Sequence, residues 1–155
     1  MRRKDKEITD KKEIEQIFKQ AQICRLGLLD DRRPYIVPMN FGYRDNTIYF
    51  HSASSGKKID LLKQNPEVCF EVDIPSGVVK AEEACSWTMG YRSLMGEGKA
   101  VFIEGTENKC RALNIIMEHY SENNKWDFDT NMVESIAVFK IEIKYVSAKK
   151  SGNRL

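Results

Sequence analysis

The chain has 155 residues, with 25 Lys and Arg against 23 Asp and Glu and a formal net charge of +2. This length suits one domain, and a hydrophobic share of 41% excludes a disordered chain. Residues 1–8 carry four cations and two anions and residues 145–155 carry three cations and no anion, so residues 9–144 hold −3 by subtraction. A nucleic-acid-binding body is therefore disfavoured, because it needs a clustered cationic face. We expect one domain over residues 1–155, with flexible basic ends at 1–8 and 147–155.

The sequence carries no feature of export or membrane insertion. The N-terminus lacks the apolar segment of a secretory signal, and no stretch of about 18 apolar residues occurs. The four cysteines form no CxxC pair, and neither His51 nor His119 has a neighbouring ligand at metal-binding spacing, so we expect no metal site. The simplest interpretation is a cytoplasmic protein with reduced thiols that binds neither nucleic acid nor a membrane.

The first half of the chain alternates between helical and strand periodicity. A helix follows the capping-box pattern of Asp10 and Glu13, and the polar turns DDRRP and RDN then separate alternating apolar runs. The expected elements are a helix at 10–21, strands at 24–29, 35–43 and 47–52, and a short helix at 59–65 that Pro66 ends.

The second half is richer in long strands. The expected elements are a strand at 67–74, a loop or hairpin extension at 75–86, a strand at 91–104, a helix capped by Thr106, a loop at 121–134 and a strand at 137–145. Gly96 and Gly98 mark places for a bulge or a close backbone approach. Six or seven strands in meander order predict an antiparallel barrel with helices packed against it, because the regular crossover helices of a Rossmann sheet are absent.

Familiar catalytic motifs are absent from the sequence. There is no P-loop, no HExxH and no GxSxG, and the glycines at 96 and 98 are not followed by the helix that a dinucleotide-binding loop requires. If the protein is an enzyme, we therefore expect a bound cofactor to supply its reactive group.

Two segments contain residue types suited to a ligand. One strand ends in His51 and Ser52, and a small-residue turn then brings Lys57 and Lys58 to a helix start. Hydroxyls, free N–H groups and cations at a helix N-terminus suit a phosphate, although an ordinary capped turn with exposed lysines has the same pattern.

The second segment runs from residue 86 to 100. Its aromatic residues Trp87 and Tyr91 lie next to Arg92 and Ser93 in sequence. Planar rings and an arginine can enclose a flat ligand, and core packing with a hairpin salt bridge is the alternative.

Taken in this order, these segments resemble the flavin-binding split-barrel family, which includes the pyridoxamine-phosphate oxidases, and within it the 5-nitroimidazole resistance (Nim) proteins. The resemblance runs from Arg2 to about Lys150. The segments that carry it are RRKDKEITD, CRLGLLDDRRPYIVPMNFGY, IYFHSASSGKKIDLLKQNPEVCFEVD, CSWTMGYRSLMGEGKA and the IEI of the last strand. It implies a mainly β fold, a six-stranded antiparallel split barrel, and a homodimer that holds FMN between its subunits, with FAD as the alternative flavin.

The resemblance also implies which residues surround the flavin. The implied cofactor-binding residues are Pro38, Met39, Asn40, His51, Ser52, Lys57, Lys58, Tyr91, Arg92 and Ser93. The strand at 38–40 would run under the isoalloxazine ring, the two lysines would neutralise the phosphate, and the segment at 91–93 would approach the flavin across the dimer. His51 is the implied catalytic residue, either as a proton donor or as a substrate contact.

The function implied by the resemblance is that of a flavin-dependent oxidoreductase, which reduces an electron-poor small molecule such as a nitroaromatic. A non-catalytic flavin- or haem-binding carrier or sensor, with His51 as the axial haem ligand, is the alternative, and an interaction module with an empty groove is a third. Fold membership does not choose among them, because split barrels also bind haem, deazaflavin or FAD.

Overall fold

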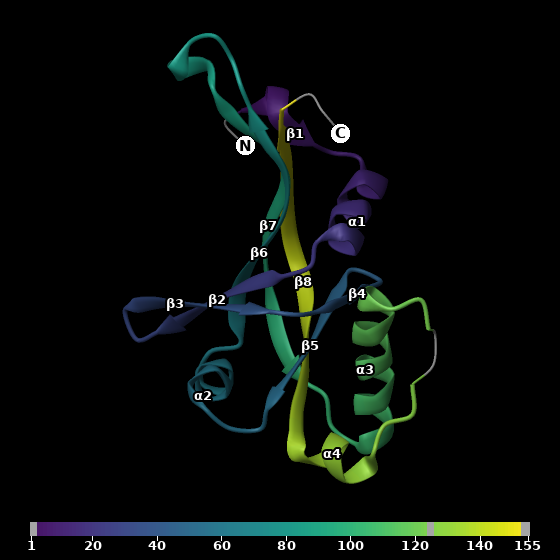
Figure 1. Cartoon of the computed structure of the whole chain (residues 1–155). Coiled ribbons are helices and arrows are strands. Elements are labelled where there is room, and N and C mark those ends of the chain that lie inside the picture. The colour runs from purple at the N-terminus through teal and green to yellow at the C-terminus, as the bar shows by residue number, and fades with distance from the viewer. Residues whose placement is uncertain (1–2, 124–125, 153–155) are drawn as a thin grey trace.

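An eight-stranded antiparallel sheet forms the centre of the computed structural model, which describes residues 3–123 and 126–152. The strands are β1 (Glu7–Ile8), β2 (Cys24–Asp30), β3 (Arg33–Met39), β4 (Gly42–Arg44), β5 (Thr47–Ala53), β6 (Glu67–Val79), β7 (Thr88–Phe102) and β8 (Ile136–Ser151). Their order is β3-β2-β6-β7-β8-β5-β4, and β1 pairs with β8 (Figure 1). The predicted mainly β barrel class is confirmed. The strand count exceeds the expected six because the short strands β1 and β4 add to it.

The helices lie on both sides of this sheet. They are α1 (Lys11–Gln20), α2 (Lys57–Gln64), α3 (Thr106–Tyr120) and α4 (Thr130–Ser135), with 3-10 turns at Lys4–Lys6 and Ala84–Ser86. Helix α2 lies beside β2, α3 lies beside β4 and β5, and α4 lies beside α3 and β8 (Figure 1). Apolar alternation explains the arrangement, since one face of the strands fills the barrel and the other receives α3.

Two clusters of buried side chains hold these layers together. The barrel interior contains the large aromatic side chains Phe18, Phe41, Phe50, Phe70 and Phe139. A separate cluster attaches α3 and α4 to the outer face of β5 and β8 and comprises Ala112, Leu113, Ile116, Val133 and Val138. The expected helix at 10–21 is confirmed, and its Asp10 side chain accepts a hydrogen bond from the Lys12 N–H at 2.9 Å.

The strand expected at 35–43 is divided into β3 and β4. The Phe41 N–H donates to the Tyr120 hydroxyl at 2.9 Å, and that hydroxyl donates to the Gln22 carbonyl at 2.9 Å. Because these bonds come from α3 rather than from a neighbouring strand, the chain leaves β2 at Asn40 and pairs with β5 from Gly42 onward.

The last strand changes face in its middle. The alternation predicts that Tyr145 shares a face with Ile141 and Ile143, yet Tyr145 is exposed. The register with β7 shifts at Gly98, so that Glu97 opposes Tyr145 while Gly98 opposes Ile143. This bulge adds one residue to β8 and turns every later side chain to the opposite face.

The expected flexible basic ends are wrong for the described residues. Strand β8 continues to Ser151, and β1 pairs with it through Glu7 opposite Lys149 and Ile8 opposite Ala148. Ile8 and Ala148 are both buried, so the two ends add a small apolar contact to their ladder of backbone hydrogen bonds. Residues 1–2 and 153–155 lie outside the described residues.

The segments at 121–134 and 75–86 contain more regular structure than a loop. The loop expected at 121–134 contains α4, which the Asp129 side chain caps by accepting from the Met132 N–H at 3.0 Å, while residues 124–125 lie outside the described residues. The stretch at 75–86 is partly a strand extension, because β6 continues to Val79. Residues 74–92, named the hairpin arm here, project beyond the body of the molecule (Figure 1).

We predict that Gly42→Ala lowers the free energy of unfolding by about 2 kcal/mol, because a Cβ on Gly42 would lie 2.5 Å from the Ile115 carbonyl oxygen in the backbone of α3. Chemical denaturation measures the change. Gly90→Ala is the matched control, since its Cβ would meet the Ser76 hydroxyl at 3.1 Å, and that side chain can turn away. An equal loss of stability in both variants would contradict the prediction.

Candidate functional site

The end of β5 and the start of α2 form one compact polar site. Gly56 has a φ of 113°, a backbone conformation that glycine adopts without strain, and it turns the chain from β5 into α2. Its carbonyl accepts from the N–H groups of Ile59 and Asp60 at 2.9 and 3.1 Å. The N–H groups of Lys57 and Lys58 precede these and have no intrahelical acceptor, so the helix N-terminus offers two free donors.

The two lysines of this site have different surroundings. The Lys57 ammonium lies 2.5 Å from the Asp30 carboxylate and 5.1 Å from the centre of the Tyr35 ring, so it is directed toward the β2–β3 hairpin. Lys58 is half-buried, and burial lowers the pKa of its ammonium. Among the described ion pairs none includes Lys58. Lys58 is therefore a partly buried cation without an ion-pair partner among the described residues, whereas Lys57 is paired.

His51 lies close enough to Lys58 to be affected by its charge. Burial lowers the pKa of the half-buried imidazole, and the positive charge of Lys58 lowers it further. The imidazole is consequently neutral at pH 7. Ser52 is also half-buried, but successive strand side chains point to opposite faces, so His51 and Ser52 approach the strand end from different sides.

Residues 38–40, which the sequence predicts to run under the ring of the cofactor, lie at the end of the edge strand β3. Pro38 and Asn40 are exposed, whereas the Met39 side chain is buried in the barrel core. Strand β3 pairs with β2 on one side and is the last strand of the sheet on the other. The backbone groups on its free edge therefore lack a strand partner within the described residues.

Tyr91, Arg92 and Ser93 lie far from this site along the same chain. Arg92 pairs with Lys150 across β7 and β8, while His51 pairs with Val138. Twelve residues of β8 separate those two positions, or about 40 Å of strand. One chain therefore does not bring the two predicted groups together.

Only some of the hydrogen-bond donors of the Arg92 guanidinium have a partner among the described residues. Its Nη2 donates to the Gln20 side chain at 2.9 Å, whereas its buried Nε has no hydrogen-bond partner among the described residues. Beside it on the strand, the Tyr91 ring lies 5.8 Å from the Lys149 ammonium.

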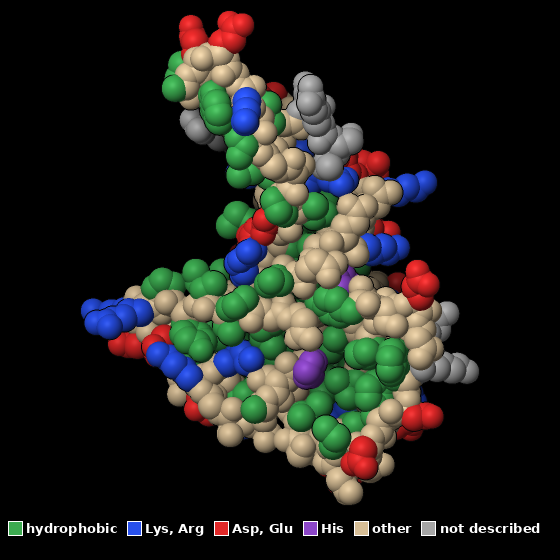
Figure 2. Space-filling model, viewed as in Figure 1, with side chains coloured by type: hydrophobic (Ala, Val, Ile, Leu, Met, Phe, Trp, Pro, Cys, Tyr) green, Lys and Arg blue, Asp and Glu red, His purple; other side chains and the backbone are tan. Residues whose placement is uncertain are grey.

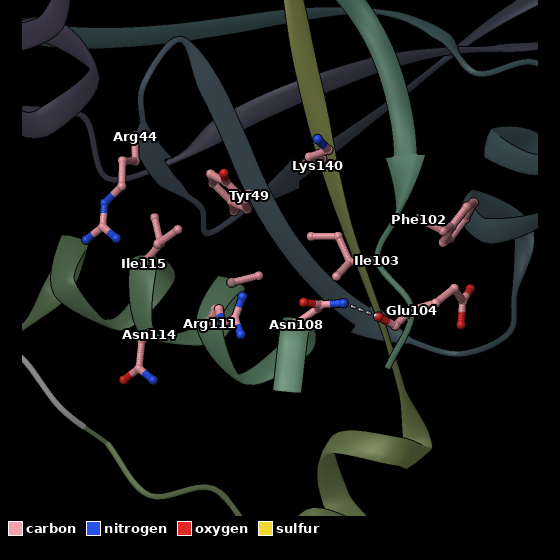
Figure 3. Close-up of a pocket in the computed structure, with 11 residues that line it drawn as sticks. Arg44, Tyr49, Phe102, Ile103, Glu104, Asn108, Arg111, Asn114, Ile115 and Lys140 are labelled. Atoms are coloured by element: carbon pink, nitrogen blue, oxygen red, sulfur yellow. Dashed lines mark hydrogen bonds between the residues drawn. The ribbon is translucent and has the colours of Figure 1, made fainter. Parts of the chain in front are cut away.

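A cavity of about 770 Å³ lies elsewhere, between α3 and the outer face of β5 and β8 (Figure 3). None of the sequence-predicted site residues lines it. Its cations are already neutralised, because Arg44 pairs with Glu118, Arg111 with Glu107, and Lys140 with Glu142. The cavity therefore has no free charge with which to attract an anion.

An exposed apolar surface was not recognised from the sequence. It comprises Leu29, Ile36, Met95 and Tyr145 and is named the outer apolar face here. Ile36 is 66% exposed and Met95 is 59% exposed, and part of the surface lines a cavity of about 640 Å³ that also includes Cys69. Figure 2 shows hydrophobic side chains on the surface of the β2–β3 hairpin and of the hairpin arm. The sequence could have revealed this surface, because its apolar residues occupy the strand positions that alternate with the core positions.

Within residues 3–123 and 126–152, no group of three His, Cys, Asp or Glu side chains is placed to hold a metal ion. No helix of that part of the chain is long and apolar enough to cross a membrane.

Three solved structures share this architecture. A protein of Bacteroides thetaiotaomicron assigned to 5-nitroimidazole antibiotic resistance is 38% identical, with a TM-score of 0.83 over 93% of this chain and 86% of that one. The flavocytochrome Anf3 of Azotobacter vinelandii has a TM-score of 0.86 at 20% identity, over 99% of this chain and 72% of that one. An FAD- and haem-binding protein of Mycobacterium smegmatis has a TM-score of 0.87 at 17% identity, over 96% of this chain and 74% of that one.

The sequence comparisons agree with this likeness. A protein of Rhizobium meliloti (strain 1021) is 29% identical over 65 residues, which are 42% of this chain and 42% of that protein. Residues 10–150 match the pyridoxamine 5'-phosphate oxidase family along nearly the whole barrel. The chain therefore belongs to the pyridoxamine 5'-phosphate oxidase family.

Proposed function

We propose that the protein is a cytoplasmic, flavin-dependent oxidoreductase that reduces an electron-poor small molecule such as a nitroaromatic. FMN is the proposed flavin, with FAD as the alternative. The observation that carries the proposal is the N-terminus of α2, where Gly56 turns the chain out of the strand that carries His51 and brings in the half-buried Lys58. Family membership and the 38% identical protein assigned to nitroimidazole resistance support the choice of cofactor and substrate class.

The N-terminus of α2 suits the phosphate of the flavin. Two backbone N–H groups, the positive end of the helix dipole and the Lys58 ammonium favour a bound anion. Burial of Lys58 favours a charged ligand further, because a desolvated cation regains electrostatic stabilisation when an anion binds.

The ring system would lie along the free edge of β3. The backbone around Asn40 can exchange hydrogen bonds with the polar edge of a flavin, and Pro38 exposes a flat apolar surface beside it. The bound flavin would supply the electrons for the reduction. The neutral His51 imidazole can hold the substrate by a hydrogen bond or, once protonated, donate a proton to it.

We propose that a second copy of the chain completes this site. Arg92, with its unpartnered Nε, lies about 40 Å of strand away from His51 within one chain. The outer apolar face supplies a surface that a second copy can cover. In a homodimer, the segment at 91–93 of one copy would face the flavin held by the other.

We predict that Lys58→Ala reduces FMN retention at least tenfold, because it removes the one desolvated cation of the site. Absorption spectra and mass spectrometry of the purified protein, followed by reconstitution with FMN, measure occupancy. Lys63→Ala, an exposed lysine on the same helix, is the control and should retain the flavin.

A colourless parent protein that takes up neither FMN nor FAD would contradict the proposal. A Soret band that disappears in His51→Ala would instead favour a haem carrier, the second candidate. That candidate is kept because the neutral imidazole of His51 is the form that ligates iron.

We predict that an anion bound beside Lys58 raises the pKa of His51. In the free protein, burial and then the charge of Lys58 lower that pKa below the ordinary value of about 6.5. A phosphate would offset the charge of Lys58 and attract the imidazolium form directly, so the pKa of His51 should rise. NMR titration of the His51 ring with and without FMN measures it, and the His119 ring is the internal control. No shift at His51, or an equal shift at both rings, would oppose the prediction.

We predict that Ile36→Glu and Met95→Glu each convert the proposed dimer into a monomer. Each variant should also retain less flavin than the parent protein. The reason is that a carboxylate in a covered apolar surface must be desolvated without a partner. Analytical ultracentrifugation gives the association state. Met132→Glu is the control, since Met132 is 70% exposed on α4, away from the outer apolar face. A parent protein that is monomeric at micromolar concentration would count against the second copy.

A further inference from the structure

We propose that the hairpin arm of each copy lies against the β2–β3 hairpin of a second copy, so that the two copies hold each other by a reciprocal arm–hairpin contact. In this contact, Glu82 and Glu83 at the tip of the arm meet Arg32 and Arg33 at the tip of the partner copy's hairpin. The inference goes beyond the flavin reaction and rests only on the second copy proposed above.

The arm and the β2–β3 hairpin both leave the sheet as two-stranded ribbons. Residues 77–79 and 88–90 of the arm pair only with each other, because β8 pairs with β7 from Tyr91 onward. Strand β2 pairs with β6 over residues 24–27 alone, so the rest of β2 has β3 as its one strand partner within the part of the chain that the structure describes. A two-stranded ribbon is marginally stable in water, and burial against another surface stabilises it.

One face of the arm is apolar although it is exposed. Side chains two residues apart on a strand share a face. The side chains on this face of β7 are Trp87, Met89, Tyr91, Ser93 and Met95. Val78 lies opposite Met89 on β6, and the two side chains are 55% and 47% exposed. An apolar stripe of this kind is typical of a surface that a protein partner covers.

The apolar face of the arm continues into the outer apolar face. Met95 lines the cavity of about 640 Å³ together with Leu29 and Ile36 of the β2–β3 hairpin. A single apolar surface therefore runs from the hairpin through that cavity and along β7 to the arm. In Figure 2, hydrophobic side chains lie along the hollow between these two projections. Under a two-fold axis, each copy presents the same hollow to the arm of the other.

The tips of the two projections carry opposite charges. Glu82 and Glu83 are exposed at the end of the arm, and Arg32 and Arg33 are exposed at the end of the hairpin. Figure 2 shows acidic side chains at the first tip and basic side chains at the second. None of the described ion pairs includes any of these four residues, so their charges are available to a partner.

This pattern of charge suits a second copy rather than a partner of one sign. Residues 80–86 sum to −1 and residues 31–33 to +1, so neither a nucleic acid nor an anionic lipid surface is attracted to both tips. In a two-fold pair, by contrast, each acidic tip meets the basic tip of the other copy, and the contact occurs twice. The charges thus fix the orientation, and the apolar surface between them supplies the buried area.

The test reverses the charges of the two tips and measures self-association. One variant carries Glu82→Lys and Glu83→Lys, a second carries Arg32→Glu and Arg33→Glu, and a third carries all four changes. We expect the first two to weaken self-association by about tenfold or more, because every contact then joins like charges. The third should associate as the parent does, since it only exchanges the two signs. Analytical ultracentrifugation with and without added FMN gives the dissociation constants.

A mixture of the first two variants tests which tips meet. Each mixed pair joins a lysine tip to a glutamate tip and a native acidic tip to a native basic tip, so both contacts are restored. Native mass spectrometry should therefore detect the mixed pair in excess over either self-pair. The control carries Glu104→Lys and Glu107→Lys, the same change of charge on exposed residues near the start of α3, and should associate as the parent does.

Three outcomes would overturn the inference. Reversed variants that associate as tightly as the parent would show that the tips do not meet, while the second copy and the flavin would still stand. A loss that neither the third variant nor the mixture restores would assign the effect to something other than pairing of the tips. A parent that is monomeric with and without FMN would remove the arm–hairpin contact together with the second copy, and its absorption spectrum would decide flavin binding separately.

Discussion

The pairing of β8 on both of its sides is the constraint on which the rest of the structure depends. Its backbone bonds to β5 near Val138 and to β7 near Lys150, so it holds His51 and Arg92 twelve residues apart along one strand. Because an extended strand rises about 3.3 Å per residue, these two positions are about 40 Å of strand apart. Any ligand that uses both groups must therefore lie between two chains. In the proposed homodimer, the extended sheet would therefore place the two groups on different copies.

Local pairing, rather than total charge, determines which cations can serve a ligand. The chain is nearly neutral, and several of its described surface cations are paired, as in Arg25 with Glu71 and Asp73. Such exposed pairs contribute little to stability, but each removes a cation from the set available to an anion. Lys58 differs because the sequence brings a lysine to the first turn of α2, where the barrel partly covers it and no described carboxylate reaches it. Burial and the lack of a partner together give this residue its proposed role.

Patterns within one segment were predictable from the sequence, and interactions between segments were not. The capped helix after Asp10 and the strand that carries His51 follow from local periodicity and capping, which depend on neighbouring residues alone. The outward turn of Tyr145 depends on a bulge opposite Gly98, and the break at Asn40 depends on a tyrosine from α3. The pairing of Lys57 with Asp30 joins residues 27 positions apart in the sequence. No local pattern encodes these three contacts, since each arises only when distant elements pack.

The outer apolar face and the proposed flavin site are coupled by thermodynamics if one dimer contains both. A flavin held by His51 and Lys58 of one copy and by Arg92 of the other would bind the dimer more tightly than the monomer. Linkage then requires that the flavin strengthen association by the same factor by which association strengthens flavin binding. The apolar surface need not be large enough to hold two copies together alone, because the cofactor contributes the remainder. Such a coupled assembly requires two features of each chain. One is an exposed apolar surface of modest size, and the other is an arginine with an unpartnered donor, as in Arg92.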